Sequence, residues 1–150
     1  MKAKLTIFFF LTCFLLTGCK RYNHSQIEGK WQVIIDEGIY YERWISGNSM
    51  IWYDSEFGIQ LWTFDFDGKI ISYKNYDKEK NTTSDSDLEE TITYLNKDSI
   101  KINVTTNTNG VSYLMKRISS EKFTPDYTTL DIEMIRDEIK KRQYKFFGNK

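Results

Sequence analysis

The side chains that most often carry catalysis are scarce in this 150-residue chain. It has one histidine, His24, and two cysteines, Cys13 and Cys19. A serine or cysteine nucleophile needs a histidine base close by, and an ordinary zinc site needs several histidines or cysteines. Neither set can be assembled from these residues. We therefore expect a protein without catalytic activity, without a bound metal and without a cofactor.

Paired carboxylates are the other candidates for chemistry. Asp65 and Asp67 lie two residues apart, but Asp67 is followed by Gly68, and this pair of residues is a strong signal for a β-hairpin turn. The later oxygen ligands of a calcium loop are missing. Glu89 and Glu90 adjoin on an expected strand and therefore face opposite sides of the sheet. A hairpin turn and two strand positions explain these carboxylates without a reaction.

The first 18 residues have the composition of a signal peptide. Lys2 and Lys4 form a basic region, and the apolar run from 5 to 16 is about a dozen residues long, against the roughly 20 that cross a bilayer. The segment 16–19, Leu-Thr-Gly-Cys, resembles the lipobox of bacterial lipoproteins. This resemblance implies that Cys19 is lipidated and becomes the first residue of the mature chain. It places the protein at the bacterial cell envelope, anchored to a membrane and facing the periplasm or the exterior.

The mature chain from 19 to 150 is long enough for one hydrophobic core and too short for two. Cys13 lies in the discarded segment, so no disulfide can form within the mature chain. The mature chain has 19 basic against 21 acidic residues, which gives no basic surface for nucleic acid. Residues 19–28, which include His24, are polar and are expected to form a tether. We expect a monomer.

From Gly29 onward, β-branched and aromatic residues alternate with polar ones between short turn signals, which predicts about eight antiparallel strands. The expected strands cover residues 30–36, 39–46, 50–54, 58–66, 69–76, 88–95, 99–106 and 111–119. The polar residues 77–87 are expected to form a mobile loop. Successive hairpins without intervening helices exclude a parallel sheet, and closure removes the two exposed edges. The predicted fold is an all-β, up-and-down barrel.

The last part of the chain predicts one helix over about 126–147. Thr128 can cap this helix, and Ile132, Ile135, Ile139 and Phe146 recur at helical spacing. We expect this apolar stripe to pack against the outside of the sheet. The basic residues near its end complement the helix dipole on a solvated face, and they leave open a contact with anionic lipid or a partner; they are Lys140, Lys141, Arg142 and Lys145.

The segment Gly29-Lys30-Trp31 at the head of the first strand, the eight strands, a basic residue in the last strand and the terminal helix resemble lipocalin-like domains of bacterial lipoproteins. In lipocalins the tryptophan closes the narrow end of the barrel beneath a late arginine. The resemblance implies that Gly29, Trp31 and Arg117 close this barrel. The second lipocalin signature, a Thr-Asp-Tyr-like turn, is absent from the turn at 96–98. A similar segment at 124–127 follows the eighth strand instead.

Two functions fit this architecture. An eight-stranded barrel can enclose one small apolar or amphipathic molecule, and Trp62, Phe64 and Tyr113 are the expected wall of such a ligand site. The alternative is a protein-interaction or inhibitor module whose barrel is filled by its own side chains. The many tryptophans and tyrosines fit a pocket wall, an exposed contact patch or a filled core equally well; they include Tyr40, Tyr41, Trp44, Trp52, Tyr53 and Trp62.

Overall fold

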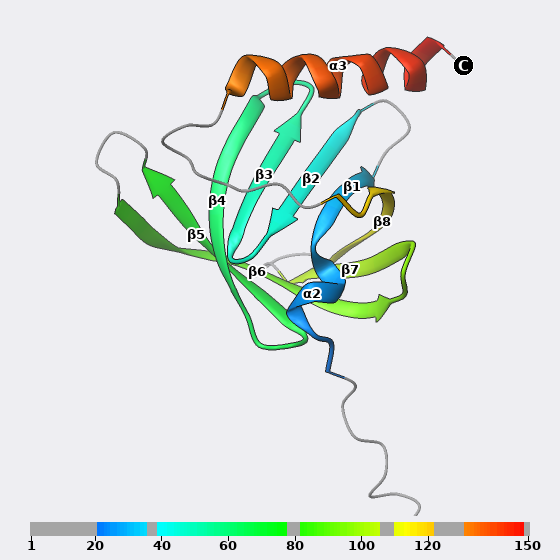
Figure 1. The fold of residues 1–150 in the computed structure, drawn as a ribbon. Helices are drawn as coiled ribbons and strands as arrows, with labels where there is room; N and C mark the ends of the chain where they lie inside the picture. The colour runs from blue at the N-terminus through cyan, green and yellow to red at the C-terminus, as the bar shows by residue number, and fades with distance from the viewer. Residues whose placement is uncertain (1–20, 36–38, 78–81, 106–109, 122–130, 149–150) are drawn as a thin grey trace, which may run out of the picture.

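Eight antiparallel strands form one closed barrel in the computed structural model, each strand paired with its neighbours in sequence and β8 paired with β1 (Figure 1). The structure describes residues 21–35, 39–77, 82–105, 110–121 and 131–148. The strands are β1 (Gly29–Ile34), β2 (Tyr41–Ser46), β3 (Ser49–Asp54), β4 (Gly58–Phe66), β5 (Ile70–Asp77), β6 (Thr82–Leu95), β7 (Ser99–Thr105) and β8 (Val111–Ser119). The predicted up-and-down barrel is confirmed.

Local turn chemistry explains why the chain reverses where it does. Gly47 and Gly68 adopt positive φ angles of 51° and 96° in the β2–β3 and β4–β5 turns. The Asp67 carboxylate accepts hydrogen bonds from the backbone N–H groups of Lys69 and Ile70, at 2.8 and 2.7 Å. These bonds lower the pKa of Asp67. Asp67 therefore serves the hairpin turn, as its position before Gly68 indicates.

The expected mobile loop over 77–87 is wrong for most of its length. Asp77 ends β5, and β6 begins at Thr82 instead of residue 88. Thr82 pairs with Asp77, and the register continues to Lys74 opposite Asp85. Backbone pairing extends this hairpin through a segment of mostly polar sequence, so a low apolar content did not exclude a strand. Residues 78–81 lie outside the described part of the chain.

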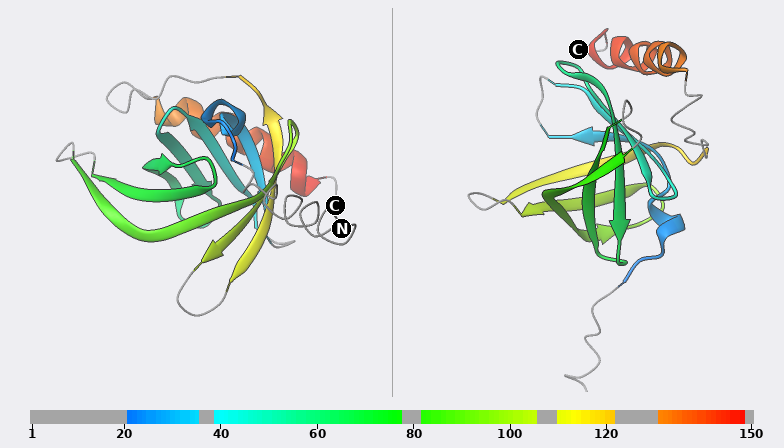
Figure 2. Two further views of the ribbon diagram at one scale, coloured as in Figure 1. Left: turned by 90° about the horizontal axis from the view of Figure 1, so that it is seen from below. Right: turned by 90° about the vertical axis from the view of Figure 1, so that its left-hand side faces the viewer.

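The segment expected to be a tether is folded where the structure describes it. Tyr22 is buried, and its backbone N–H donates to Gly68 O at 2.7 Å. A short helix, α2 (His24–Ile27), follows and carries the fully buried Ile27 beneath the barrel. The sequence did not predict this packing, because the segment is mostly polar and only two of its residues, Tyr22 and Ile27, are buried apolar side chains. The folded domain thus begins near Tyr22. Figure 2 shows α2 at one end of the barrel, which we call the closed end.

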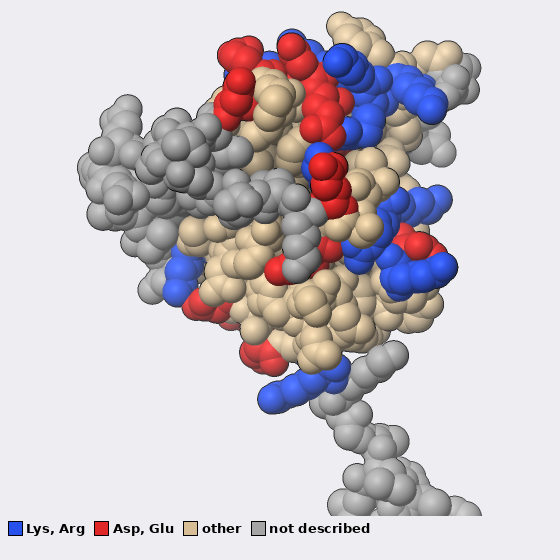
Figure 3. Space-filling view, in the orientation of Figure 1, with Lys and Arg blue, Asp and Glu red and all other residues tan. Residues whose placement is uncertain are grey.

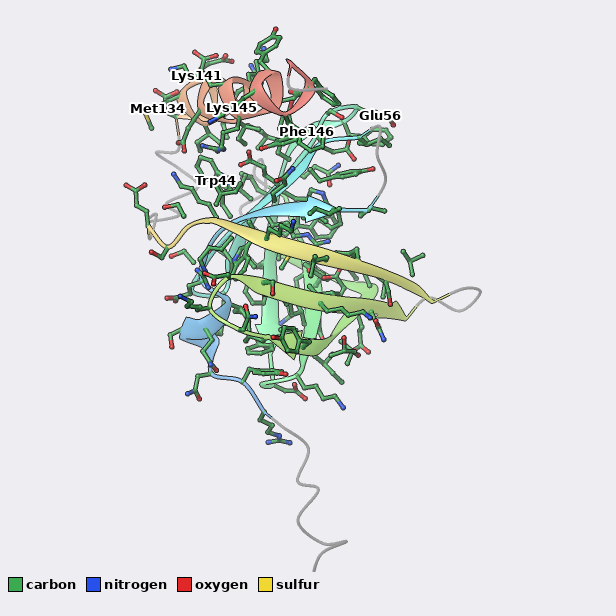
Figure 4. All side chains as sticks on the ribbon, turned by 90° about the vertical axis from the view of Figure 1, so that its right-hand side faces the viewer. Trp44, Glu56, Met134, Lys141, Lys145 and Phe146 are labelled. Atoms are coloured by element: carbon green, nitrogen blue, oxygen red, sulfur yellow. The ribbon has the colours of Figure 1, made fainter. Side chains whose placement is uncertain are left out.

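The terminal helix α3 (Ile132–Gly148) lies across the outside of β2, β3 and β4, as predicted. Ile135 and Ile139 are buried against these strands, and Figure 4 shows Phe146 on the barrel side of the helix. The helix begins at Ile132, and Asp131 caps its N-terminus. The Asp131 carboxylate accepts a 2.9 Å hydrogen bond from the backbone N–H of Met134. The expected cap, Thr128, lies outside the described residues.

Figure 3 shows acidic side chains gathered toward the start of α3 and basic side chains toward its end, which suits the helix dipole. Within the described ranges, no helix combines the length and the apolar character needed to cross a membrane. Residues 1–18, which we expect to be a signal peptide, and Cys19 lie outside these ranges.

Candidate functional site

The barrel interior is filled at its closed end. Trp31, Phe64 and Ile100 are at most 1% exposed, and they belong to one core cluster with Met50 and Ile102. Alternation places these residues inward from β1, β3, β4 and β7. His24 of α2 stacks on Phe64, with 5.6 Å between the ring centroids. This end therefore has the close packing of a protein core.

The opposite end of the interior, which we call the far end, is exposed to solvent. Apolar side chains on the inward strand faces are only partly buried there, and Val111 is 47% exposed. We call five of these the rim cluster: Tyr41, Trp52, Trp62, Val104 and Val111. The rings of Trp52 and Trp62 lie 6.4 Å apart between centroids. Apolar surface that faces the inside of a barrel and yet meets water is a candidate ligand site.

A buried ion pair spans the interior between the filled core and the rim cluster. Arg43 of β2 donates from Nη1 and Nη2 to the two carboxylate oxygens of Glu90 on β6, at 2.6 and 2.9 Å. The hydroxyl groups of Tyr73 and Tyr113 also donate to Glu90. Both charged side chains are 1% exposed. We call these four residues the inner network.

The charges of the inner network stabilise one another. Burial alone would raise the pKa of Glu90, but the Arg43 charge and the three hydrogen-bonding side chains lower it below its ordinary value. Burial raises the pKa values of Tyr73 and Tyr113, and Glu90 raises them further. At neutral pH the network therefore holds one cation, one anion and two neutral phenols. Its net charge is zero.

Arg43 also touches the rim cluster. Its guanidinium carbon lies 4.0 Å from the centroid of the Trp52 ring and 4.9 Å from that of Tyr113. Trp52 lies opposite Arg43 in the β2–β3 register. The Arg43 Nε, which is buried, has no hydrogen-bond acceptor among the described residues. The rim cluster thus lies directly above the Arg43–Glu90 ion pair, whose two charges cancel.

The three residues expected to line a ligand site all lie on inward strand faces, but at different depths. Trp62 is partly exposed, and its indole N–H donates to Gln60 Oε1 at 3.2 Å. Tyr113 is 5% exposed and belongs to the inner network. Phe64 is sealed in the closed end beneath His24. The structure therefore places Trp62 in the solvent-exposed half, Tyr113 in the buried inner network and Phe64 in the closed-end core.

At the closed end, Arg117 lies over Trp31, 3.9 Å from its ring centroid. Its guanidinium donates to the backbone oxygens of Lys97, Glu28 and Gln26. A Cβ added to Gly29 would lie 2.8 Å from the backbone oxygen of Ser119 and 2.5 Å from Arg117 Nη1, and Gly29 has a φ of +126°. Only glycine fits this close approach. Gly29, Trp31 and Arg117 thus form one contact beside α2.

A second buried ion pair lies on the outside of β2. The Glu42 carboxylate, 0% exposed, accepts hydrogen bonds from Arg142 Nε and Nη2, both at 2.8 Å. Tyr40 and Trp44 also donate to it, at 2.5 and 2.8 Å. Arg142 therefore holds α3 against the barrel and does not belong to a solvated basic face, which corrects the expectation from its position. We call these four residues the outer network.

Neither network was recognised from the sequence. The available signal was the segment 40–45, Tyr-Tyr-Glu-Arg-Trp-Ile, in which both strand faces are apolar except for one charge each. Tyr41, Arg43 and Ile45 share the inward face, and Glu42 lies between Tyr40 and Trp44 on the outward face. A charge between apolar neighbours on one strand face requires a buried partner. The partners, Glu90 and Arg142, are distant in sequence.

The part of the chain that the structure describes contains no group of three or more histidine, cysteine or acidic side chains arranged to hold a metal ion. One polar surface hollow of about 490 Å³ lies beside α2 and is lined by residues that include Gln26, Asp98 and Arg117. Comparison with protein-family models and with curated proteins finds no match to this chain.

Proposed function

We propose that this protein is a membrane-anchored lipoprotein whose barrel binds a small apolar or amphipathic molecule without catalysis. One observation carries the ligand site: the rim cluster presents partly exposed aromatic and aliphatic side chains on the inward faces of the barrel strands. Inward apolar surface that is left in contact with water gains free energy when an apolar ligand covers it. The site is therefore the solvent-exposed half of the interior.

The alternative, an interaction or inhibitor module, is favoured by the filled closed end alone. The core around Trp31 and Phe64 is closely packed and has no space for a ligand. The partial exposure of Trp52 and Trp62 favours the ligand site over this alternative, because a barrel filled along its whole length would bury both rings.

Tryptophan fluorescence tests the proposal. The chain from residue 20 onward is titrated with fatty acids, retinoid-like molecules and haem-like molecules, and saturable quenching is expected for at least one class. Trp62→Phe should weaken this response. Trp44→Phe is the matched control, since Trp44 lies on the outward face beneath α3 and should leave binding unchanged (Figure 4). The absence of any response across the panel would favour the interaction module.

The membrane anchor is tested separately. Cys19→Ala removes the proposed lipidation position, and several acyl chains hold a protein stably where one alone is marginal. The variant should therefore leave the membrane fraction, with an unchanged circular dichroism spectrum. Retention in the membrane fraction after a salt wash would contradict lipid anchoring.

A further inference from the structure

The inner network has donor hydrogens for which no described residue supplies an acceptor. Arg43 Nη1 reaches Glu90 and Tyr73, and Nη2 reaches Glu90. In the described part of the chain, the Nε–H group has no acceptor, and Nη2, which carries two hydrogens, makes one hydrogen bond. A guanidinium presents Nε–H and one Nη–H side by side as a fork. Arg43 thus uses the end of its guanidinium for Glu90 and leaves the neighbouring edge open.

An unused donor at this depth is costly. A buried donor without an acceptor loses the hydrogen bonds that water would make, and the cost is larger for a charged group. Arg43 is 1% exposed, so bulk water does not reach it. Apolar residues in place of Arg43 and Glu90 would avoid this loss of stability, since replacement of a buried ion pair by apolar side chains is often neutral or stabilising. The open edge is therefore a place where an occupant of the barrel gains a hydrogen bond.

The rim cluster is the side from which an occupant reaches this edge. Tyr41 lies two residues from Arg43 on the same strand face, toward the far end, and Trp52 lies opposite Arg43 in register. Both side chains are partly exposed. A ligand that inserts between the rim side chains and displaces the Trp52 ring would meet the Arg43 guanidinium next.

Charge decides what kind of acceptor this edge takes. Glu90 already neutralises Arg43, and its carboxylate accepts four hydrogen bonds. Asp54, at the far end of β3 on the inward face, adds a further carboxylate. A ligand carboxylate would bring an unpaired negative charge into this region, and an unpaired buried charge is strongly unfavourable. A neutral acceptor oxygen adds no charge.

We propose that the barrel binds an uncharged apolar molecule bearing a carbonyl-type oxygen, and that this oxygen accepts hydrogen bonds from the free Nε and Nη2 edge of Arg43. This assignment rests on the proposed ligand-binding function and names the ligand class for the same site. It excludes the free fatty acids as preferred ligands, although their chains suit the rim cluster equally well.

Three ligands with the same hydrocarbon chain test the assignment: an alkane, the methyl ketone and the carboxylate. The full-length protein is placed in lipid nanodiscs and titrated by calorimetry, and the heats of partition into empty nanodiscs are subtracted. The ketone should bind at least about tenfold more tightly than the alkane, because a hydrogen bond from a charged donor contributes that much or more. The ketone should also bind more tightly than the carboxylate.

The variant that removes the donor must not leave a buried charge. Arg43→Met combined with Glu90→Leu removes both charges together, and replacement of a buried ion pair by apolar side chains is commonly tolerated. This double variant should bind alkane and ketone with equal affinity. A ketone labelled with ¹³C at its carbonyl gives a second readout, since hydrogen bonding lowers the carbonyl stretching frequency. The frequency should be lowered in the wild-type protein and not in the double variant.

The outcomes separate this assignment from the proposed function. Binding of all three ligands with equal affinity, and an unshifted carbonyl frequency, would overturn the role of Arg43 and retain the ligand-binding barrel. Preference for the carboxylate would overturn the charge argument. Absence of binding by every ligand would overturn the proposed function itself, and with it this inference.

Discussion

Neighbouring residues of β2, Glu42 and Arg43, belong to two hydrogen-bonded networks of similar design on opposite faces of one sheet. Glu90 inside the barrel and Glu42 outside it each accept four hydrogen bonds, two from one arginine and one from each of two aromatic side chains. Their arginines differ in exposure. The side chain of Arg43 is 1% exposed and that of Arg142 is 25% exposed.

This difference in exposure separates two tasks. The outer network connects α3 to the barrel, and solvent already reaches part of the Arg142 side chain. Arg142 also donates to Glu138 of its own helix, at 2.7 Å, which fixes the orientation of its side chain. The inner network is sealed from bulk water, and the described residues leave one donor edge of Arg43 without an acceptor. A glutamate held by one arginine and two aromatic side chains therefore serves attachment on one face and, in our proposal, recognition on the other.

The largest expected effect comes from the loss of one inner charge. Glu90→Leu leaves the Arg43 guanidinium buried without its anion, and removal of one partner of a buried pair costs roughly 3–5 kcal/mol of unfolding free energy. Chemical denaturation followed by circular dichroism measures this cost. The double variant with Arg43→Met should recover most of the lost stability, because no charge then remains unpaired. If the double variant is no more stable than Glu90→Leu, the ion pair itself stabilises the barrel.

Features of the structure that depend on neighbouring residues could be predicted from the sequence, and features that depend on residues distant in sequence could not. The turns at Gly47 and Gly68, and the bounds of β4 and β8, follow from neighbouring residues, and the structure has them where the sequence predicts them. The barrel follows from the succession of hairpins. Strand alternation puts Trp62 on one face with Phe64 and Phe66, and the aromatic character of this face favours the inside of the barrel. The depth of Trp62 depends on the length and tilt of every strand.

The networks could not be foreseen, because their partners are distant. Arg43 and Glu90 are 47 residues apart, and Glu42 and Arg142 are 100 residues apart. The position of Arg142 over Glu42 depends on how α3 crosses β2, which the helical stripe alone does not determine. The fold of residues 22–28 was missed for a related reason, since two apolar side chains suffice when a barrel end offers them a surface.

Acid should distinguish the inner network from the rest of the molecule. The Arg43 charge and three hydrogen-bonding partners hold the pKa of Glu90 below its ordinary value in the folded state, despite burial. The unfolded chain therefore binds more protons than the folded chain as the pH falls below about 4.3, and the stability that Glu90 contributes is lost through its lowered pKa. The contribution is fully present at higher pH.

Urea midpoints measured between neutral pH and pH 3 check this expectation. The wild-type midpoint should fall as the pH decreases below about 4. The Arg43→Met, Glu90→Leu double variant should show a shallower decrease, because it lacks this carboxylate. It retains Glu138, whose pKa is lowered by hydrogen bonds from Arg142 and Lys30 in opposition to its burial. Parallel pH profiles for the two proteins would mean that Glu90 makes no net contribution in this range.

The smallest and most selective change removes one phenol hydroxyl from each network. Tyr73→Phe removes one of four hydrogen bonds to Glu90, and Tyr40→Phe removes one of four to Glu42. Each carboxylate keeps three donors and each ring keeps its packing. Tyr73→Phe also removes the oxygen that accepts a 3.1 Å hydrogen bond from Arg43 Nη1, which adds to its expected cost. A hydrogen bond to a charged group contributes roughly 1.5–3 kcal/mol, and a typical neutral one about 1 kcal/mol. We expect Tyr73→Phe to cost about 2 kcal/mol and Tyr40→Phe about 1 kcal/mol, since water can replace the lost hydroxyl only beside the partly exposed Arg142. Denaturation midpoints of the two variants measure the difference, and equal costs would show that solvent access does not distinguish the two faces of β2.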